Sequence, residues 1–186
     1  MTLPHLIQAL GTLGADHVGL VPVEEISFEP AFRALCEQNA CGMYGRSWMC
    51  PPEVGEIHAL IAQARQYEIA LVFQTIDHLV DSYDFEGMMA AGDRMNRLLQ
   101  AVRKEAPPNA LILGAGGCRR CRRCAKMDQA PCRFPDQALA SLEAYGVNVS
   151  LLAPQAGMQY INGANTVTYF GAIFLGKNTP AGAAMA

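Results

Sequence analysis

Four cysteines lie close together in the second half of the sequence, at a spacing typical of metal ligands. They are Cys118, Cys121, Cys124 and Cys132, and they form the pattern C-x2-C-x2-C-x7-C. Three thiols at successive three-residue steps can bind irons of one cubane, as they do in the bacterial ferredoxin-type segment. The pattern therefore predicts a [4Fe–4S] cluster, with these four residues as its ligands.

Both the metal and the fourth ligand of this set have an alternative. A single zinc ion more often uses two separated C-x2-C pairs, which makes zinc the second choice here. In two-cluster ferredoxins the fourth cysteine precedes a proline and binds the other cluster. Here Cys50 precedes Pro51, whereas Cys132 precedes Arg133. Either cysteine can complete the set, although closure by Cys132 needs only a short loop.

Three more cysteines, Cys36, Cys41 and Cys50, form a second group with the pattern C-x4-C-x8-C-P-P. Three thiolates do not complete a tetrahedral ion or a four-iron cubane. The candidates for the missing ligand are His58, Glu53, Cys132 and a small molecule. If the position stays open, the site resembles catalytic metal sites, which keep one position free for a substrate. We expect Tyr44 and Trp48 to line such a pocket.

The seven cysteines are confined to these two segments. An odd number of cysteines, with no export signal at the start of the sequence, argues against a disulfide framework. Cysteines that act only as small core side chains would not segregate in this way. We therefore predict that all seven bind metal, in one or two [4Fe–4S] clusters.

The two segments also resemble a known family. The sequences CGMYGRSWMCPP, GGCRRCRRCAKMDQAPCRFPDQALASLEAYGVNV and INGANTVTYFGAIFL are similar to those of the predicted metal-binding proteins, a cysteine-rich domain of unknown function. The resemblance extends from about Cys36 to Leu175, and all seven cysteines match its pattern. It implies metal binding by these cysteines and supplies no reaction.

Six basic residues surround the second cysteine segment, and only Asp128 opposes them. They are Arg119, Arg120, Arg122, Arg123, Lys126 and Arg133. Positive charge near an anionic cluster raises its reduction potential, and it also favours an acidic redox partner or a small anionic ligand. The alternative is a solvated basic face. No aromatic residues alternate with the arginines, so we expect no nucleic acid partner.

Two other segments carry polar or glycine-rich patterns without a complete motif. Gly114 to Gly117 lack the lysine of a phosphate-binding loop, and we expect them to let the backbone approach the cluster and donate N–H groups to its sulfurs. Asp77 and His78 follow the most apolar predicted strand, where α/β proteins often place functional groups, but a turn-capping role is the simpler interpretation.

Alternating helical and strand patterns must position these segments. The periodicity predicts helices over 3–13, 53–66, 84–104 and 135–145, and a short one that ends near Cys36. Strands are predicted over 17–23, 69–76, 110–113, 147–152 and 166–175. The fold class is therefore α/β or α+β, with a central sheet of about four to five strands, packed helices and a cysteine-rich cluster-binding subregion. We expect one domain over residues 1–186, with cysteine segments at 36–52 and 118–135 and a flexible tail at 177–186.

Composition limits the remaining choices. The 186 residues are 51% hydrophobic and 17% charged, which excludes general disorder. No apolar run is long enough to span a bilayer, and a net charge of −3 gives no general attraction to nucleic acid or membranes. We predict a cytoplasmic iron–sulfur protein that transfers electrons. The alternatives are an iron–sulfur enzyme that uses an open iron at the three-cysteine site, and a zinc-binding structural or interaction module.

Overall fold

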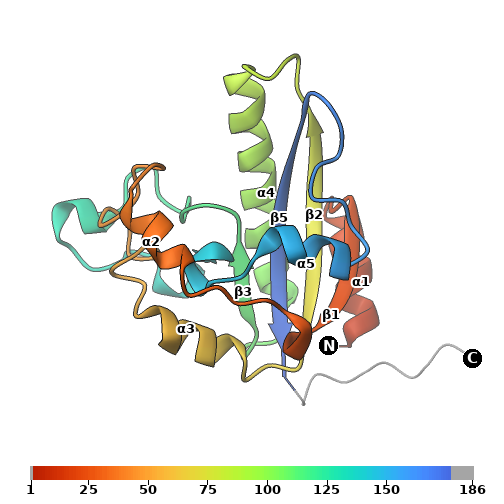
Figure 1. Ribbon diagram of the computed structural model, residues 1–186, viewed down its shortest axis with the longest axis horizontal. Helices are drawn as coiled ribbons and strands as arrows, with labels where there is room; N and C mark the ends of the chain where they lie inside the picture. The colour runs from red at the N-terminus through yellow and green to blue at the C-terminus, as the bar shows by residue number, and fades with distance from the viewer. Residues whose placement is uncertain (1, 177–186) are drawn as a thin grey trace, which may run out of the picture.

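The fold of the chain was taken from a computed structural model, which describes residues 2–176, and it is built around one mixed sheet (Figure 1). The strands are β1 (His17–Pro22), β2 (Ile69–His78), β3 (Leu111–Gly114), β4 (Ala140–Ser141) and β5 (Thr166–Leu175). Their order across the sheet is β1-β2-β5-β3-β4. Only β3 and β4 pair in parallel; the other pairs are antiparallel. The predicted α+β class and strand number are confirmed.

Helices and irregular segments cover both faces of this sheet. The α-helices are α1 (Leu3–Thr12), α2 (Phe32–Glu37), α3 (Ile57–Ala64), α4 (Phe85–Glu105) and α5 (Val149–Gln155). One face packs against α1 and α4, through residues such as Leu10, Leu99 and Phe73. The other face packs against α3 and α5, through residues such as Leu60 and Phe174. The two hydrophobic clusters lie on either side of the sheet because successive strand residues point to opposite faces.

The sheet holds the segment that leads into the second cysteine group. β3 ends at Gly114, beside the short strand β4, and the amide of Leu142 donates to the Gly114 carbonyl at 2.9 Å. A Cβ atom on Gly114 would lie 2.5 Å from Cδ1 of Leu99, so any larger residue here would displace the Leu99 side chain of α4. The chain therefore leaves β3 at a position fixed by both the sheet and α4.

Three predicted elements were wrong in type or extent. The helix predicted over 53–66 begins only at Ile57, because Glu56 is its N-cap and accepts hydrogen bonds from the amides of His58 and Ala59. The helix predicted over 135–145 is replaced by two 3-10 turns with β4 between them, because β3 offers an unpaired edge to that segment. Most of the strand predicted over 147–152 is instead the start of α5, which begins at Val149 and buries Val149, Leu152 and Ala153 on one helical face. Val147 forms only an isolated antiparallel bridge with Phe28.

The predicted tail at 177–186 lies outside the described residues. Within residues 2–176, none of the helices combines the length and apolar character that crossing a bilayer requires.

Candidate metal centre

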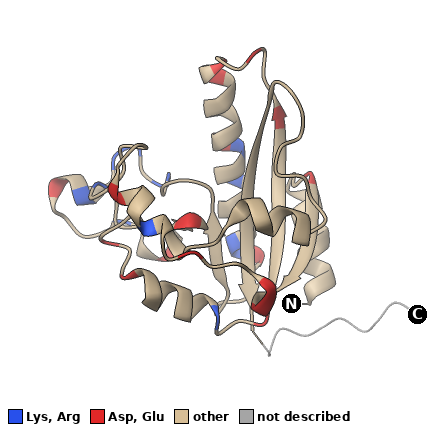
Figure 2. Ribbon diagram, viewed as in Figure 1, with Lys and Arg blue, Asp and Glu red and all other residues tan. Residues whose placement is uncertain are grey.

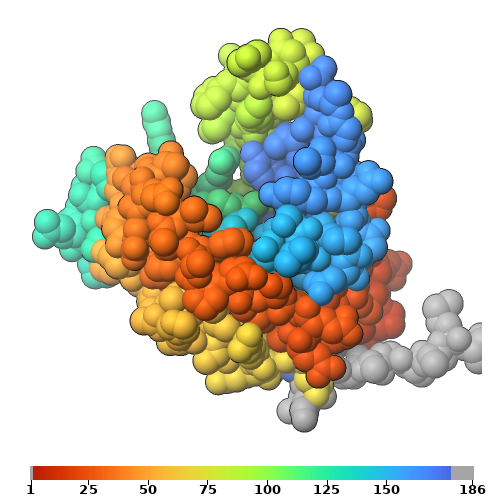
Figure 3. All heavy atoms as spheres, in the orientation of Figure 1, coloured from red at the N-terminus to blue at the C-terminus, as the bar shows by residue number. Residues whose placement is uncertain are grey.

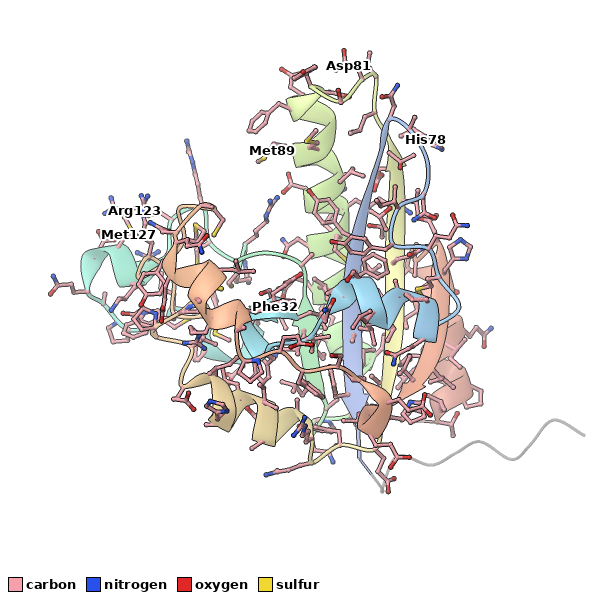
Figure 4. All side chains as sticks on the ribbon, in the orientation of Figure 1. Phe32, His78, Asp81, Met89, Arg123 and Met127 are labelled. Atoms are coloured by element: carbon pink, nitrogen blue, oxygen red, sulfur yellow. The ribbon has the colours of Figure 1, made fainter. Side chains whose placement is uncertain are left out.

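The two cysteine segments pack against each other beside the sheet, although they are far apart in the sequence. We call residues 36–54 and 115–134 together the cysteine lobe (Figures 1 and 4). The indole Nε1 of Trp48 donates to the Ala130 carbonyl at 3.0 Å. Lys126 pairs with Glu53, and its ammonium lies 4.8 Å from the centre of the Trp48 ring. These contacts join the first segment to the second.

Four thiols from the two segments line one pocket of about 550 Å³. Cys36 lies near the end of α2, Cys41 and Cys50 in the loop that follows, and Cys118 after the glycine-rich turn. The other residues that line this pocket are Met43, Tyr44, Pro51, Gly116, Gly117, Arg119, Ser141, Glu143 and Ala144. The structure therefore brings Cys118 to the three cysteines of the first segment.

The backbone at Gly117 passes close to the buried Cys50. A Cβ atom on Gly117 would lie 3.4 Å from the Sγ atom of Cys50 and 3.6 Å from Cε of Met43. Gly116 has a φ of +66°, in the left-handed region that favours glycine. The glycine-rich turn thus runs along the wall of the pocket, next to its most buried sulfur.

The thiols in the pocket affect each other electrostatically. Burial raises the pKa of Cys50, the Ser47 hydroxyl lowers it, and the sulfurs of Cys41, Cys36 and Cys118 raise it further. Thiolates that repel one another in this way are stabilised when they share a cation.

Cys36 has acidic and basic neighbours as well. Burial is the largest effect and raises the pKa of the Cys36 thiol, whereas the Arg33 guanidinium lowers it. Cys41 and the carboxylates of Glu143 and Glu37 raise it further. Burial also raises the pKa of Glu143, whose carboxyl lines the same pocket. The side of the pocket near Cys36 therefore combines one guanidinium with a poorly hydrated carboxyl.

Cys121 and Cys124 lie on a second and larger groove, of about 1010 Å³, which also reaches Cys41 and Cys118. Its other lining residues are Gly42, Met43, Arg46, Met89, Asp93, Arg119, Arg122, Arg123 and Met127. Cys132 lines neither cavity. Within the part of the chain that the structure describes, no three side chains of His, Cys, Asp or Glu form a group that could hold one metal ion. Six of the seven cysteines thus line two adjoining cavities, and Cys132 lies outside both.

The other residues considered from the sequence lie in different places. His58 is exposed on α3 and does not line the pocket, whereas Tyr44 does. Trp48 packs between the two segments, where Glu53 is paired with Lys126. Asp77 accepts a 3.1 Å hydrogen bond from Nη1 of Arg94.

His78 lies at the far end of β2, away from the cysteine lobe (Figure 4). Sequence reasoning missed Ser141 and Glu143, because Ser141 reaches the pocket only as part of β4 and Glu143 only through the 3-10 turn that follows it.

The arginines of the second segment have distinct partners. Arg123 pairs with Asp128 at 2.7 Å, and Arg120 lies 4.1 Å from the centre of the Phe134 ring. Arg119 is 3.9 Å from Asp93 on α4. Arg122 has no ion pair among the described residues. The basic segment is therefore partly used in local structure, and Arg122 at the groove retains an unneutralised charge.

Replacing Lys126 with methionine should loosen the cysteine lobe. Only 15% of the Glu53 side chain is exposed, and the substitution leaves its carboxylate without its cationic partner. We expect a local loss of about 1–3 kcal/mol, the range for a buried polar group that loses its partner. Hydrogen exchange should report it as faster exchange in residues 36–54 and 115–134.

The matched control is Lys104→Met, because Lys104 is an exposed lysine at the end of α4. It should leave exchange in the lobe unchanged. Equal exchange in both variants would mean that the Lys126–Glu53 contact does not hold the two segments together.

Comparison with known proteins gives one match. No curated protein and no solved structure matches the chain at a significant level. The model of one protein family, described as "Predicted metal-binding protein (DUF2284)", matches residues 19–175. This range includes all seven cysteines and every strand of the sheet except the first two residues of β1. The chain therefore belongs to this family of predicted metal-binding proteins.

Proposed function

We propose that the protein binds a [4Fe–4S] cluster through Cys36, Cys41, Cys50 and Cys118 and transfers electrons. The observation that carries the proposal is that these four thiols, from two distant segments, line one pocket. A bound cluster of this kind supplies reversible one-electron chemistry. The proposal departs from the grouping by sequence spacing alone, in which Cys118 shares a cluster with Cys121, Cys124 and Cys132.

The size of the pocket favours a cluster over one zinc ion. Zinc–sulfur bonds of about 2.3 Å place four thiolates around a single point, with sulfurs about 3.8 Å apart. A cubane instead presents four separate irons, so its thiolates surround a larger body. A pocket of about 550 Å³ with thiols on its wall suits the second arrangement.

The surroundings of the pocket also suit an anionic group. The Nε and Nη2 atoms of Arg33 are buried and lack a hydrogen-bond partner in the described part of the chain. This guanidinium is near enough to Cys36 to lower its pKa. A cluster with four thiolates carries negative charge, so it would compensate the buried guanidinium. Gly116 and Gly117 bring backbone close to Cys50, as amide donors to cluster sulfurs require.

The remaining cysteines support a second candidate function. Under this proposal Cys121, Cys124 and Cys132 are three thiols without a fourth, and two of them face the large groove. A metal centre there would have an open position accessible from solvent, which is the property of catalytic sites. We therefore keep an iron–sulfur enzyme as the second candidate, with its open position in this set rather than in Cys36, Cys41 and Cys50.

Anaerobic purification followed by iron and acid-labile sulfide analysis tests the proposal. We expect at least four iron and four sulfide per chain, and a reversible one-electron signal by electron paramagnetic resonance on reduction. Such a protein requires a redox partner protein and a reducing compartment such as the cytoplasm. Stoichiometric zinc with no labile sulfide after anaerobic reconstitution would overturn the proposal and favour the zinc-binding module.

A further inference from the structure

The turn between β2 and α4 exposes an unusual amount of apolar surface. We call residues 79–86 the tip. Val80 is 85% exposed, Tyr83 is 89% exposed and Phe85 is 71% exposed. Large apolar side chains that gather on one exposed turn are typical of an interaction site. Within the described residues of one chain, nothing covers them.

Hydrogen bonds hold the tip in one conformation. The carboxylate of Asp84 accepts from the amide of Gly87 at 2.8 Å and from that of Val80 at 3.1 Å, and these bonds lower the pKa of Asp84. Asp81 accepts from the amide of Tyr83 at 2.7 Å. A turn that is already ordered loses little conformational entropy when it binds. The tip is therefore built to present its aromatic side chains.

The groove of about 1010 Å³ beside the cysteine lobe has a complementary lining. It lies between α4 and the lobe, and Figure 3 shows the hollow between the upper half of α4 and the lobe. Met89 points from α4 into this space, on the side where Met127 and Arg123 lie (Figure 4). Met43, Met89 and Met127 all line the groove. Methionine side chains are flexible and polarizable, so they adapt readily to aromatic partners.

The charges of the tip and the groove are opposite. The tip carries Asp81 and Glu86, both exposed, in addition to the capping Asp84. The groove is lined by four arginines and one carboxylate, Asp93, so its lining is net positive. Arg119 and Arg123 already pair with Asp93 and Asp128, whereas Arg46 and Arg122 have no ion pair among the described residues. Figure 2 shows acidic residues at the top of α4 and a mixture of basic and acidic residues on the lobe. The chain thus contains both an acidic, aromatic projection and a basic, methionine-lined groove of suitable size.

We propose that the tip of one chain binds in the groove of a second copy, so that the protein is a two-fold symmetric dimer. Tyr83 lies two residues before α4 begins at Phe85, and the groove-lining part of α4, centred between Met89 and Asp93, lies about 9 Å further along the helix. Two α4 helices that pair antiparallel, with the axis near Gly87, place each tip at the other groove. Both contacts form together because a two-fold interface uses the same surface twice.

The dimer adds residues of the partner copy to the cysteine groove. The partner's Tyr83 would cover the groove wall that holds Cys121 and Cys124, and so would limit solvent access to these two thiols. The proposal does not depend on the identity of the metal, because the contacts that we propose between tip and groove use aromatic, methionine and charged side chains that are not ligands.

Sedimentation velocity of anaerobically purified protein, with metal measured on every sample, tests the dimer. We expect a species of twice the 20.1 kDa chain mass that dissociates on dilution. Tyr83→Ser removes the most exposed aromatic side chain, and Arg122→Glu reverses an unpaired charge in the groove. Each should weaken dimerisation by about tenfold or more, the scale of an interface hot spot. Arg122→Glu combined with Glu86→Arg should recover part of the loss.

Matched controls use positions away from both surfaces. Ile161→Ser removes an apolar side chain that is 75% exposed, and Arg65→Glu reverses an exposed charge at the end of α3. Both variants should dimerise as the unmodified chain does. Alkylation of Cys121 and Cys124 should be slower in the dimer than in the Tyr83→Ser monomer.

Three results would overturn the proposal. They are a monomer at every concentration, a dimer that Tyr83→Ser and Arg122→Glu leave intact, and assemblies that grow beyond two chains. Because metal content is measured on the same samples, a protein that dimerises without an iron–sulfur cluster would refute the proposed function alone.

Discussion

Replacing Cys118 with serine should remove the same cluster as replacing Cys50 does. Both residues line the pocket with Cys36 and Cys41, and serine is a much weaker ligand for iron than a thiolate. Each variant should therefore lose the iron, sulfide and electron paramagnetic resonance signal of that one centre. This is the largest functional effect that we expect from a single substitution, because the proposed chemistry resides in the cluster.

Cys121→Ser is the matched control, because it makes the same substitution three residues away. It should leave the signal of the first cluster in place, with any loss confined to a second centre. Circular dichroism should show that all three variants keep their secondary structure. If Cys118→Ser and Cys121→Ser lose one common centre while Cys50→Ser loses another, the four-thiol assignment is refuted and the grouping by sequence spacing is favoured.

Replacing Phe174 with alanine should destabilise the whole sheet by about 3–5 kcal/mol, the usual cost of truncating a buried phenylalanine. Phe174 is fully buried in β5, which pairs with both β2 and β3. Its ring lies 6.2 Å from that of Tyr67, edge to face. The substitution removes these contacts and leaves a cavity. Urea denaturation followed by far-ultraviolet circular dichroism measures the change.

Phe134→Ala provides a matched aromatic control in the cysteine lobe. Its side chain is 36% exposed and packs under Arg120, so its loss should cost much less than that of Phe174.

The Phe174→Ala variant should still bind metal under native conditions, because local contacts such as Trp48–Ala130 hold the lobe together. Equal destabilisation by the two substitutions would contradict a core centred on the sheet.

The sequence was sufficient to predict the strands and helices that have a long and regular pattern of apolar residues. The apolar run from Ile69 predicted β2, and the three- and four-residue spacing from Phe85 predicted α4. These patterns are reliable because a helix packed against the sheet buries one face, which places apolar residues every three or four positions, and a strand buries its residues as an apolar run or an alternating pattern. The strand at Thr166–Leu175 was predicted with the same bounds.

Short segments were decided by their neighbours instead. The apolar residues of 147–152 fit a strand or a helix equally well, and packing of Leu152 and Ala153 into the core beneath α5 selected the helix. Residues 135–145 have a helical pattern, but pairing of Ala140 with Leu113 satisfied the free edge of β3 and divided the segment into turns. Neither the core beneath α5 nor the free edge of β3 can be recognised from the residues of these short segments.

The same division holds for the candidate site. The sequence by itself determined which donors are present, because the spacing of thiols within each segment is local. The family match adds only a description of predicted metal binding. The sequence did not determine which thiols share a pocket. That depends on where β3 ends and on how Trp48, Lys126 and Glu53 join the two segments. Contacts between residues so far apart in the chain are fixed only by packing of the whole fold, so only the tertiary structure could place Cys118 beside Cys50.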